Sequence, residues 1–205
     1  MRNAIRLTGV LLLALLASAC GTADLLQSKV AEPQVYVLKP ADAGVAQVAF
    51  NYQLAVALPT ALPGLDTDRI AVLRNGNHLD YFFGARWGGT APEVTQAFIV
   101  ALLQSQQGFR NVVAENARID ADYLLEVSIA DFQAEYAGSA AAPVVHVTLV
   151  ANLISIKQRR SLPAIRATAS VNAKENQLGA VVSAFQSALQ QTTTHLSEQL
   201  VTALK

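Results

Sequence analysis

Cys20 is the only cysteine in the 205-residue chain, and its surroundings give it a clear chemical role. It follows the basic residues Arg2 and Arg6, an apolar run over residues 7–16 and the small residues Ala17-Ser18-Ala19. This order is typical of a secretory signal peptide, because the run is shorter than the roughly 20 residues that cross a bilayer. The thiol stands where bacterial lipoproteins accept a diacylglycerol. We therefore predict a signal peptide over residues 1–19 and lipid attachment at Cys20.

The alternative for Cys20 is ordinary secretion with a free thiol. Ala17 occupies the place where this type of signal usually has leucine, and Leu16 lies one residue further back. Lipidation remains the favoured interpretation, since a stray thiol would otherwise fall by chance at the one position where lipidation needs it. Gly21 follows the cysteine in place of the aspartate that favours inner-membrane retention. The prediction is therefore a lipid anchor in the inner leaflet of the outer membrane, with the protein facing the periplasm.

The remaining residues with chemical potential do not form a recognisable catalytic or metal-binding set. The three histidines lie in different predicted elements, without cysteine or acidic neighbours at metal-ligand spacing: His78, His146 and His195. There is no G-x-S-x-G element, and Gly88-Gly89 lacks the lysine of a phosphate-binding loop. We predict a protein that is not an enzyme and needs no metal or cofactor.

Two close pairs of carboxylates could in principle act as acid and base or bind calcium: Asp66 with Asp68, and Asp120 with Asp122. Both pairs lie in turn-like stretches, where aspartate is favoured for its local backbone hydrogen bonds. Two carboxylates are also too few for a typical calcium shell. Their predicted role is therefore structural.

Arg86-Trp87 is the more informative pair, because it directly precedes a predicted helix. In one interpretation Trp87 packs under the start of the helix and Arg86 pairs locally. In the other, both residues form a partner-facing corner. The sequence alone leaves both interpretations open, and we carry Arg86 and Trp87 forward as candidate partner-facing residues.

The charge of the chain argues against nucleic acid as a partner. Its formal net charge is zero, and loss of Arg2 and Arg6 with the signal would leave the mature chain slightly acidic. Binding to phosphates depends on clustered positive charge, which is missing here. With its single cysteine the chain cannot form an internal disulfide, so the fold must be stabilised by its hydrophobic core.

Alternating apolar residues predict the strands. Residues 50–58 alternate with a period of two, which predicts a strand with one buried face. Shorter strands are predicted over residues 35–38, 70–73, 78–83 and 109–113, with a hairpin turn at Asn75-Gly76. Three further strands with short connections predict an antiparallel meander over the following ranges: 123–136, 145–153 and 165–171.

Two amphipathic helices are predicted to cover this sheet. Thr90 and Glu93 form a capping box, and a helix follows to about Gln107, with Gly108 as its stop. Its predicted apolar stripe consists of Val94, Ala97, Phe98, Ala101 and Leu102. A long C-terminal helix has a stripe made of Leu178, Val181, Phe185, Leu189, Leu196, Leu200 and Leu204.

The predicted fold class is therefore α/β, with a mixed, mostly antiparallel sheet packed by two long amphipathic helices in a single domain. The predicted organisation is a signal peptide over residues 1–19, a lipidated tether over residues 20–33 and a domain over residues 34–205. Whether the domain forms a homo-oligomer is left open.

Several short motifs resemble the ABC-type transport auxiliary lipoprotein family. They are an early tyrosine-leucine strand at residues 36–38, Leu58-Pro59, an L-x-x-x-x-I segment from Leu65 to Ile70, and Ala85-Arg86-Trp87 ahead of an amphipathic helix. The motifs are short and extend over nearly the whole chain. Gly88-Gly89 depart from the family, which usually continues with Ala-Glu-Pro-Leu.

The resemblance implies an α/β domain that faces the periplasm and accompanies a mammalian-cell-entry (MCE) domain protein, an ABC permease and an ABC ATPase. Such systems move lipids or other hydrophobic molecules between the two membranes. The chain would then contribute anchoring, docking or gating. Alternatives are a carrier with a lipid pocket between sheet and helix, and a structural lipoprotein of outer-membrane assembly.

Replacing Cys20 with serine tests the anchor. Cys20→Ser should abolish palmitate labelling and release the protein from membranes, because the hydroxyl does not replace the thiol in lipidation. Labelling in cells followed by membrane fractionation measures both effects. Continued labelling of the variant would show that the anchor is assigned to the wrong residue.

Overall fold

Strand β7 (Tyr123–Tyr136) is the longest strand in the described part of the chain, and it organises the sheet. The computed structural model describes residues 32–41, 44–46, 48–117, 120–137 and 141–205. From Pro33 to Lys205 the chain is one compact unit. Cys20 and the predicted signal peptide lie outside the described residues.

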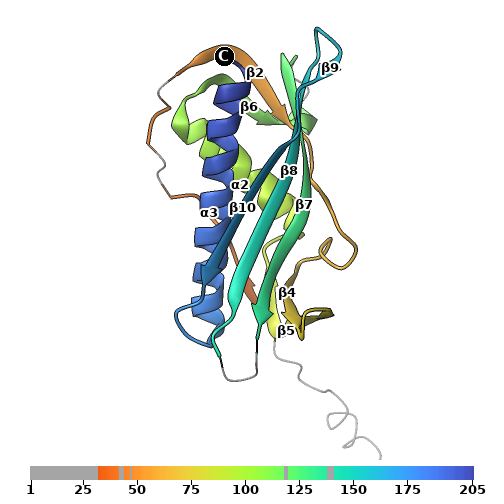
Figure 1. Ribbon diagram of the computed structural model, residues 1–205, viewed down its shortest axis with the longest axis vertical. Coiled ribbons are helices and arrows are strands. Elements are labelled where there is room, and N and C mark those ends of the chain that lie inside the picture. Colours follow the sequence, from red (N-terminus) through yellow and green to blue (C-terminus); the bar gives the residue numbers. More distant parts are fainter. Residues whose placement is uncertain (1–31, 42–43, 47, 118–119, 138–140) are drawn as a thin grey trace, which may run out of the picture. The chain divides into compact units, whose positions relative to one another are not determined.

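Each edge of β7 is paired with other strands. One edge pairs with β8 (Val144–Ser155), antiparallel and along nearly its whole length. The other edge pairs in succession with three short parallel strands, which follow one another in the chain: β2 (Phe50–Val56), β3 (Thr60–Ala61) and β4 (Arg69–Arg74). In Figure 1, β7 and β8 form a long ribbon with β2 toward one end and β4 toward the other.

The outer strands extend the sheet on both sides. Beyond β4 lie the antiparallel β5 (His78–Trp87) and then β1 (Gln34–Tyr36), which is parallel to β5. Beyond β2 lies the parallel β6 (Phe109–Ala114). The antiparallel partners of β8 on its other side are β10 (Ile165–Asn172) and the short β9 (Arg160–Ser161).

The structure confirms an α/β domain with a mixed sheet and corrects the prediction that the sheet is mostly antiparallel. The predicted meander of β7, β8 and β10 is antiparallel. However, five of the nine described pairings are parallel. The short connections between β2, β3 and β4 did not indicate these parallel pairings. The three strands lie end to end along one edge of β7, so no crossover is needed between them.

Strand β2 also corrects the predicted one-sided burial. The residues from Gln53 to Val56 are all buried, so the alternation of residue types does not translate into alternating exposure. The cause is the central position of β2 between β6 and β7, since strands inside a parallel arrangement are covered on both faces. A register shift between Phe50 and Gln53 accompanies the change.

Helix α2 (Ala91–Gln106) begins at the predicted capping box, and its buried face differs from the predicted stripe. Val94, Ala97 and Ala101 are at least partly exposed, while Thr95, Ile99 and Leu103 are buried. Seven apolar residues in a row, 97–103, make this helix apolar on several sides, so the sequence does not specify its orientation. The helix ends at Gln106, and its cap residue Gln107 adopts a left-handed conformation (φ 54°), one residue before the predicted stop at Gly108.

Helix α3 (Leu178–Ala203) packs against β8 and β10 and carries most of its predicted stripe into the core. Fully or nearly fully buried on this helix are Val181, Phe185, Leu189, Leu196 and Leu200. Leu178 and Leu204, at its two ends, are partly buried. Figure 1 shows α3 in blue alongside β10, with α2 behind it. Among the described helices, none is long and apolar enough to cross a membrane.

The segment between β1 and β2 lies against both helices. The Lys39 backbone N–H donates to Gln186 Oε1 at 3.1 Å, and the Ala41 N–H donates to Gln190 Oε1 at 3.0 Å, so two α3 side chains hold this segment. At the other end of the segment the Ala46 N–H donates to the Gln106 carbonyl at 2.7 Å. Buried Gln106 accepts a further bond from Ser197 Oγ at 2.6 Å, which joins α2 to α3.

A charge at Leu189 tests the buried face of α3. Leu189→Asp should lower the free energy of unfolding by at least about 4 kcal/mol, because it removes buried apolar contacts and leaves an unpaired carboxylate in the core. Gln191→Asp, at an exposed position of the same helix, is the matched control and should change it by less than about 0.5 kcal/mol. Urea unfolding measures both, and equal losses would refute the assignment of the face.

Candidate functional site

The Trp87 ring belongs to the core, which settles one half of the predicted corner. Only 1% of the residue is exposed. Its ring meets Phe185 of α3 at a centroid distance of 5.1 Å and Phe132 of β7 at 5.8 Å, and these two rings lie 5.2 Å apart. The three rings join β5, β7 and α3. The prediction that Trp87 faces a partner is therefore wrong for its side chain, because the curled sheet places the ring beneath α3.

The indole N–H of Trp87 is buried in this cluster without a hydrogen-bond partner. Its indole Nε1 has no hydrogen-bond acceptor among the described residues. A buried N–H of this kind costs about 1–3 kcal/mol, and buried tryptophans usually avoid that cost. The apolar and aromatic contacts of the ring must therefore stabilise the fold by more free energy than the unpaired N–H costs.

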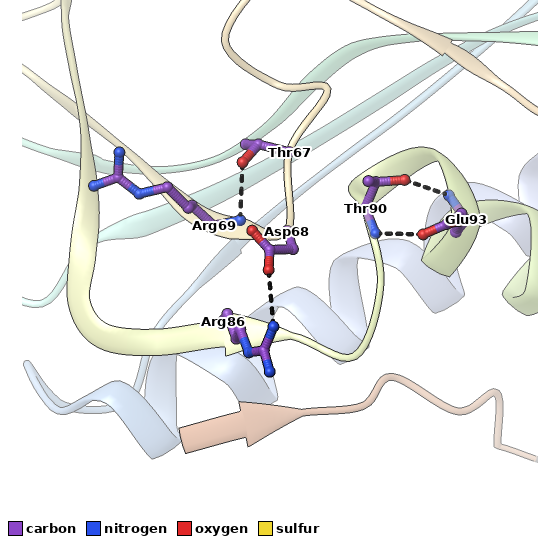
Figure 2. Close-up of polar contacts among 6 residues, drawn as sticks. All are labelled: Thr67, Asp68, Arg69, Arg86, Thr90 and Glu93. Atoms are coloured by element: carbon purple, nitrogen blue, oxygen red, sulfur yellow. Dashed lines mark hydrogen bonds and ion pairs between the residues drawn. The ribbon is translucent and has the colours of Figure 1, made fainter. Parts of the chain in front are cut away.

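Arg86, the other member of the pair, points outward and is about half exposed (49%). Its Nη1 donates to Asp68 Oδ2 at 3.3 Å, as Figure 2 shows. Asp68 is itself 39% exposed, so water screens the pair and its contribution to stability is about 0–1 kcal/mol. The guanidinium is thus positioned by Asp68 and remains accessible on the surface.

Backbone contacts fix the corner between β5 and α2. The Trp87 N–H donates to the Asp68 carbonyl at 2.7 Å, and the Ala91 N–H donates to the Thr67 carbonyl at 2.9 Å. The Gly88 N–H donates to the Tyr36 carbonyl of β1 at 2.8 Å. These bonds link the corner to β1 and to the chain ahead of β4, so Arg86 stands on a rigid support.

The predicted capping box is present, and Gly89 lies directly beside it. The Thr90 N–H donates to Glu93 Oε2 at 2.7 Å, and the Glu93 N–H donates to Thr90 Oγ1 at 3.4 Å (Figure 2). A Cβ at position 89 would lie 2.8 Å from Glu93 Oε2. Glycine therefore leaves room for the carboxylate to return to the helix start.

A shallow groove of about 420 Å³ lies beside this corner. It is lined by residues of the segment after β1, the glycine pair and the first turns of α2: Val37, Leu38, Gly88, Gly89, Glu93, Val94 and Ala97. The lining combines apolar side chains with one carboxylate. Such a surface can bind a side chain of a partner protein.

The carboxylate pairs act as structural groups. Asp68 accepts from Arg86, and Asp122 Oδ2 accepts from the Gln53 backbone N–H at 2.8 Å. Arg110 Nη2 lies 3.6 Å from the same oxygen of Asp122. Among the described residues, no three histidine, cysteine or acidic side chains come together as a metal site.

The histidines lie on separate elements, as predicted, at the start of β5, in β8 and in α3. His146 contacts two polar side chains: its Nδ1 lies 2.9 Å from Ser170 Oγ, and its Nε2 lies 3.3 Å from Glu135 Oε2. Its side chain is 30% exposed. Ser170 lies on β10 and Glu135 on β7, so these contacts connect β8 to both of its neighbouring strands.

Two tyrosines away from the corner have shifted pKa values. Burial, followed by the neighbouring Tyr52, raises the pKa of Tyr123. Burial also raises the pKa of Tyr136, and nearby Arg74 opposes that rise. Both hydroxyls are therefore protonated at neutral pH and can donate, as Tyr136 does to Asn176 Oδ1 at 2.9 Å.

Comparison with known proteins identifies the class of protein to which this architecture belongs. A family model described as ABC-type transport auxiliary lipoprotein component matches residues 36–197. This is most of the chain and nearly all of the described domain. The chain therefore belongs to the ABC-type transport auxiliary lipoprotein family and is an auxiliary component of ABC-type transport.

Solved structures support the fold. Protein XCC0632 from Xanthomonas campestris has 25% sequence identity and a TM-score of 0.71, over 80% of this chain and 92% of that protein. An uncharacterised protein has 16% identity and a TM-score of 0.66, over 83% of this chain and 99% of the other. The comparison with curated proteins gave no match.

Substitutions at the corner separate its two halves. Trp87→Ala should lower the free energy of unfolding by about 3–5 kcal/mol, because it empties the volume between Phe132 and Phe185. Arg86→Ala should lower it by no more than about 1 kcal/mol, since it removes only a screened ion pair. Circular dichroism during urea unfolding measures both. A large loss for Arg86→Ala would mean that the corner depends on the ion pair instead of the rings.

Proposed function

We propose that this protein is a non-enzymatic, periplasm-facing lipoprotein subunit of an ABC/MCE-type system that moves lipids or hydrophobic molecules across the envelope. The observation that carries the proposal is the family match over residues 36–197, combined with a lipoprotein signal that ends at Cys20. Its partners would be an MCE-domain protein, an ABC permease and an ABC ATPase. Lipidated Cys20 would attach the domain to the inner leaflet of the outer membrane, as Gly21 favours.

The domain would act as a docking body, and the corner at Arg86 is its proposed contact site. Arg86 is exposed, is positioned by Asp68 and stands close to the groove that Glu93 and Val37 line. A guanidinium presents several donors in a fixed plane and suits carboxylate groups on a partner. The rigid backbone support below it reduces the entropy lost on binding.

The packing between sheet and helices favours docking over the rival function of lipid carriage. In the described domain the side chains that face α3 from β8 and β10 form one contiguous buried cluster with those of the helix. A carrier would need an apolar cavity large enough for an acyl chain, typically about 300 Å³ or more. The groove beside the corner lies at the surface, where a partner can reach it. The second rival, a structural lipoprotein of outer-membrane assembly, would share this surface and differ in its partners.

Site-specific cross-linking tests the proposal. A photoreactive amino acid at position 86 of the full-length, lipidated protein should capture an MCE-domain protein, permease or ATPase in cells, identified by mass spectrometry. The same amino acid at position 157, an exposed turn position remote from the corner, is the matched control and should capture none of them.

Other products would favour one of the rivals. Capture of only barrel-assembly or cell-wall proteins at position 86 would identify a structural lipoprotein. Stoichiometric phospholipid in purified Cys20→Ser protein, measured by mass spectrometry, would identify a carrier, because the anchor itself is then absent.

A further inference from the structure

Phe83 is the most exposed large hydrophobic residue of the described chain, with 95% of its surface accessible. Nothing in the corner or the groove uses it. A large aromatic side chain placed fully in water gains free energy when it is transferred to an apolar or interfacial environment. Its position is therefore a candidate for a contact outside the domain.

A bulge in β5 produces this exposure. Tyr81 pairs with Ala71 of β4, and the next pair is Arg86 with Arg69, so residues 82–85 stand opposite the single residue Ile70 and form a bulge, in which Ala85 still pairs with Gln34 of β1. Phe82 packs against the core, and Gly84 adopts a left-handed conformation (φ 66°), which bends the strand. Phe83 is held between these two residues and points to solvent.

The bulge lies beside the place where the chain from Cys20 reaches the domain. Gln34 of β1 pairs with Ala85, and β1 runs parallel to β5. Following the chain backwards from Gln34 therefore leads in the direction of Gly84 and Phe83. Residues 21–32, which separate Cys20 from Pro33, span at most roughly 45 Å even when fully extended. A lipidated Cys20 would keep the start of β1 within roughly 45 Å of the bilayer.

Two further observations fit a membrane surface. Val35 and Val37, on β1 and just after it, are 52% and 62% exposed, so three of the exposed large hydrophobics lie on this edge of the sheet. Arg69, at the base of the bulge, is exposed and can approach lipid phosphates. Its guanidinium lies over the Tyr81 ring, 3.8 Å from the ring centroid, which holds it beside the bulge.

We propose that Phe83, at the edge of the sheet formed by β5 and β1, inserts into the interface of the bilayer that holds the Cys20 anchor. The contact would fix how the domain stands on the membrane and turn a flexible attachment into an oriented one. The proposal rests on the anchor assigned under the proposed function. It commits to a phospholipid surface, and a protein partner for Phe83 is an outcome of the test.

Tryptophan fluorescence tests the contact in the full-length lipidated protein. Trp87 is the only native tryptophan and is buried, so the native protein supplies a constant background. Phe83→Trp protein is reconstituted into vesicles of phosphatidylethanolamine and phosphatidylglycerol, with or without bromine on the acyl chains. Bromine quenches an indole that enters the lipid, and most of the emission added by the substitution should be lost.

Ile156→Trp is the matched control. Ile156 is exposed and follows the pair of Tyr123 with Ser155, at the end of the β7–β8 ladder away from β4 and roughly 30 Å from the bulge. Figure 1 shows β9, beside this turn, at the opposite end of the sheet from β5. Its added emission should be insensitive to bromine.

The outcomes distinguish the lipid anchor at Cys20 from the membrane contact of Phe83. Flotation with the vesicles together with quenching confined to Phe83→Trp supports the contact. Flotation with no quenching, or with a shift of the Phe83→Trp emission only when transporter subunits are added, would overturn the membrane contact and leave the anchor standing. Protein that does not float with the vesicles would overturn both the anchor and the contact.

Discussion

The hydrogen bonding of β7 is the constraint on which the rest of the structure depends. A buried strand must satisfy the N–H and C=O groups on both of its edges, because an unpaired buried peptide group costs about as much as a lost hydrogen bond. β8 satisfies one edge of β7. Because β2, β3 and β4 share the other edge in sequence order, the chain from residue 50 to residue 74 must run alongside β7. The places of β5, β1 and β6 follow from this.

The aromatic cluster at Trp87 converts that sheet into a domain with a defined surface. By placing one ring each from β5, β7 and α3 together, the core fixes the end of β5 relative to the helix. Arg86 precedes Trp87 in β5 and points outward, so the packing of Trp87 also fixes the backbone position of Arg86. The ion pair with Asp68 therefore needs to contribute little. An exposed cation above a buried aromatic anchor is a reasonable way to keep a recognition group in place without strong surface interactions.

In the described domain, titratable side chains make structural contacts. They stabilise turns, caps and strand pairs, as Asp122, Glu93 and His146 show. The chain belongs to the ABC-type transport auxiliary lipoprotein family, and under the proposed function its domain contributes contacts to a transport system. Within this view the edge formed by β1 and β5 combines two roles: it is next to the chain that leads to Cys20, and it carries the exposed Arg86 and Phe83.

The sequence by itself determined the features that arise from neighbouring residues: the capping box at Thr90, the Asn75-Gly76 turn, the antiparallel meander and the buried stripe of α3. Each is fixed by local backbone geometry or by a clear period. Only the tertiary structure decided the parallel pairings of β7, the buried face of α2, the burial of Trp87 and the exposure of Phe83. Strands far apart in the chain pair through backbone groups, which are the same in every residue. Adjacent apolar residues such as Phe82 and Phe83 point to opposite faces of a strand, and only the tertiary structure decides which of the two faces the core.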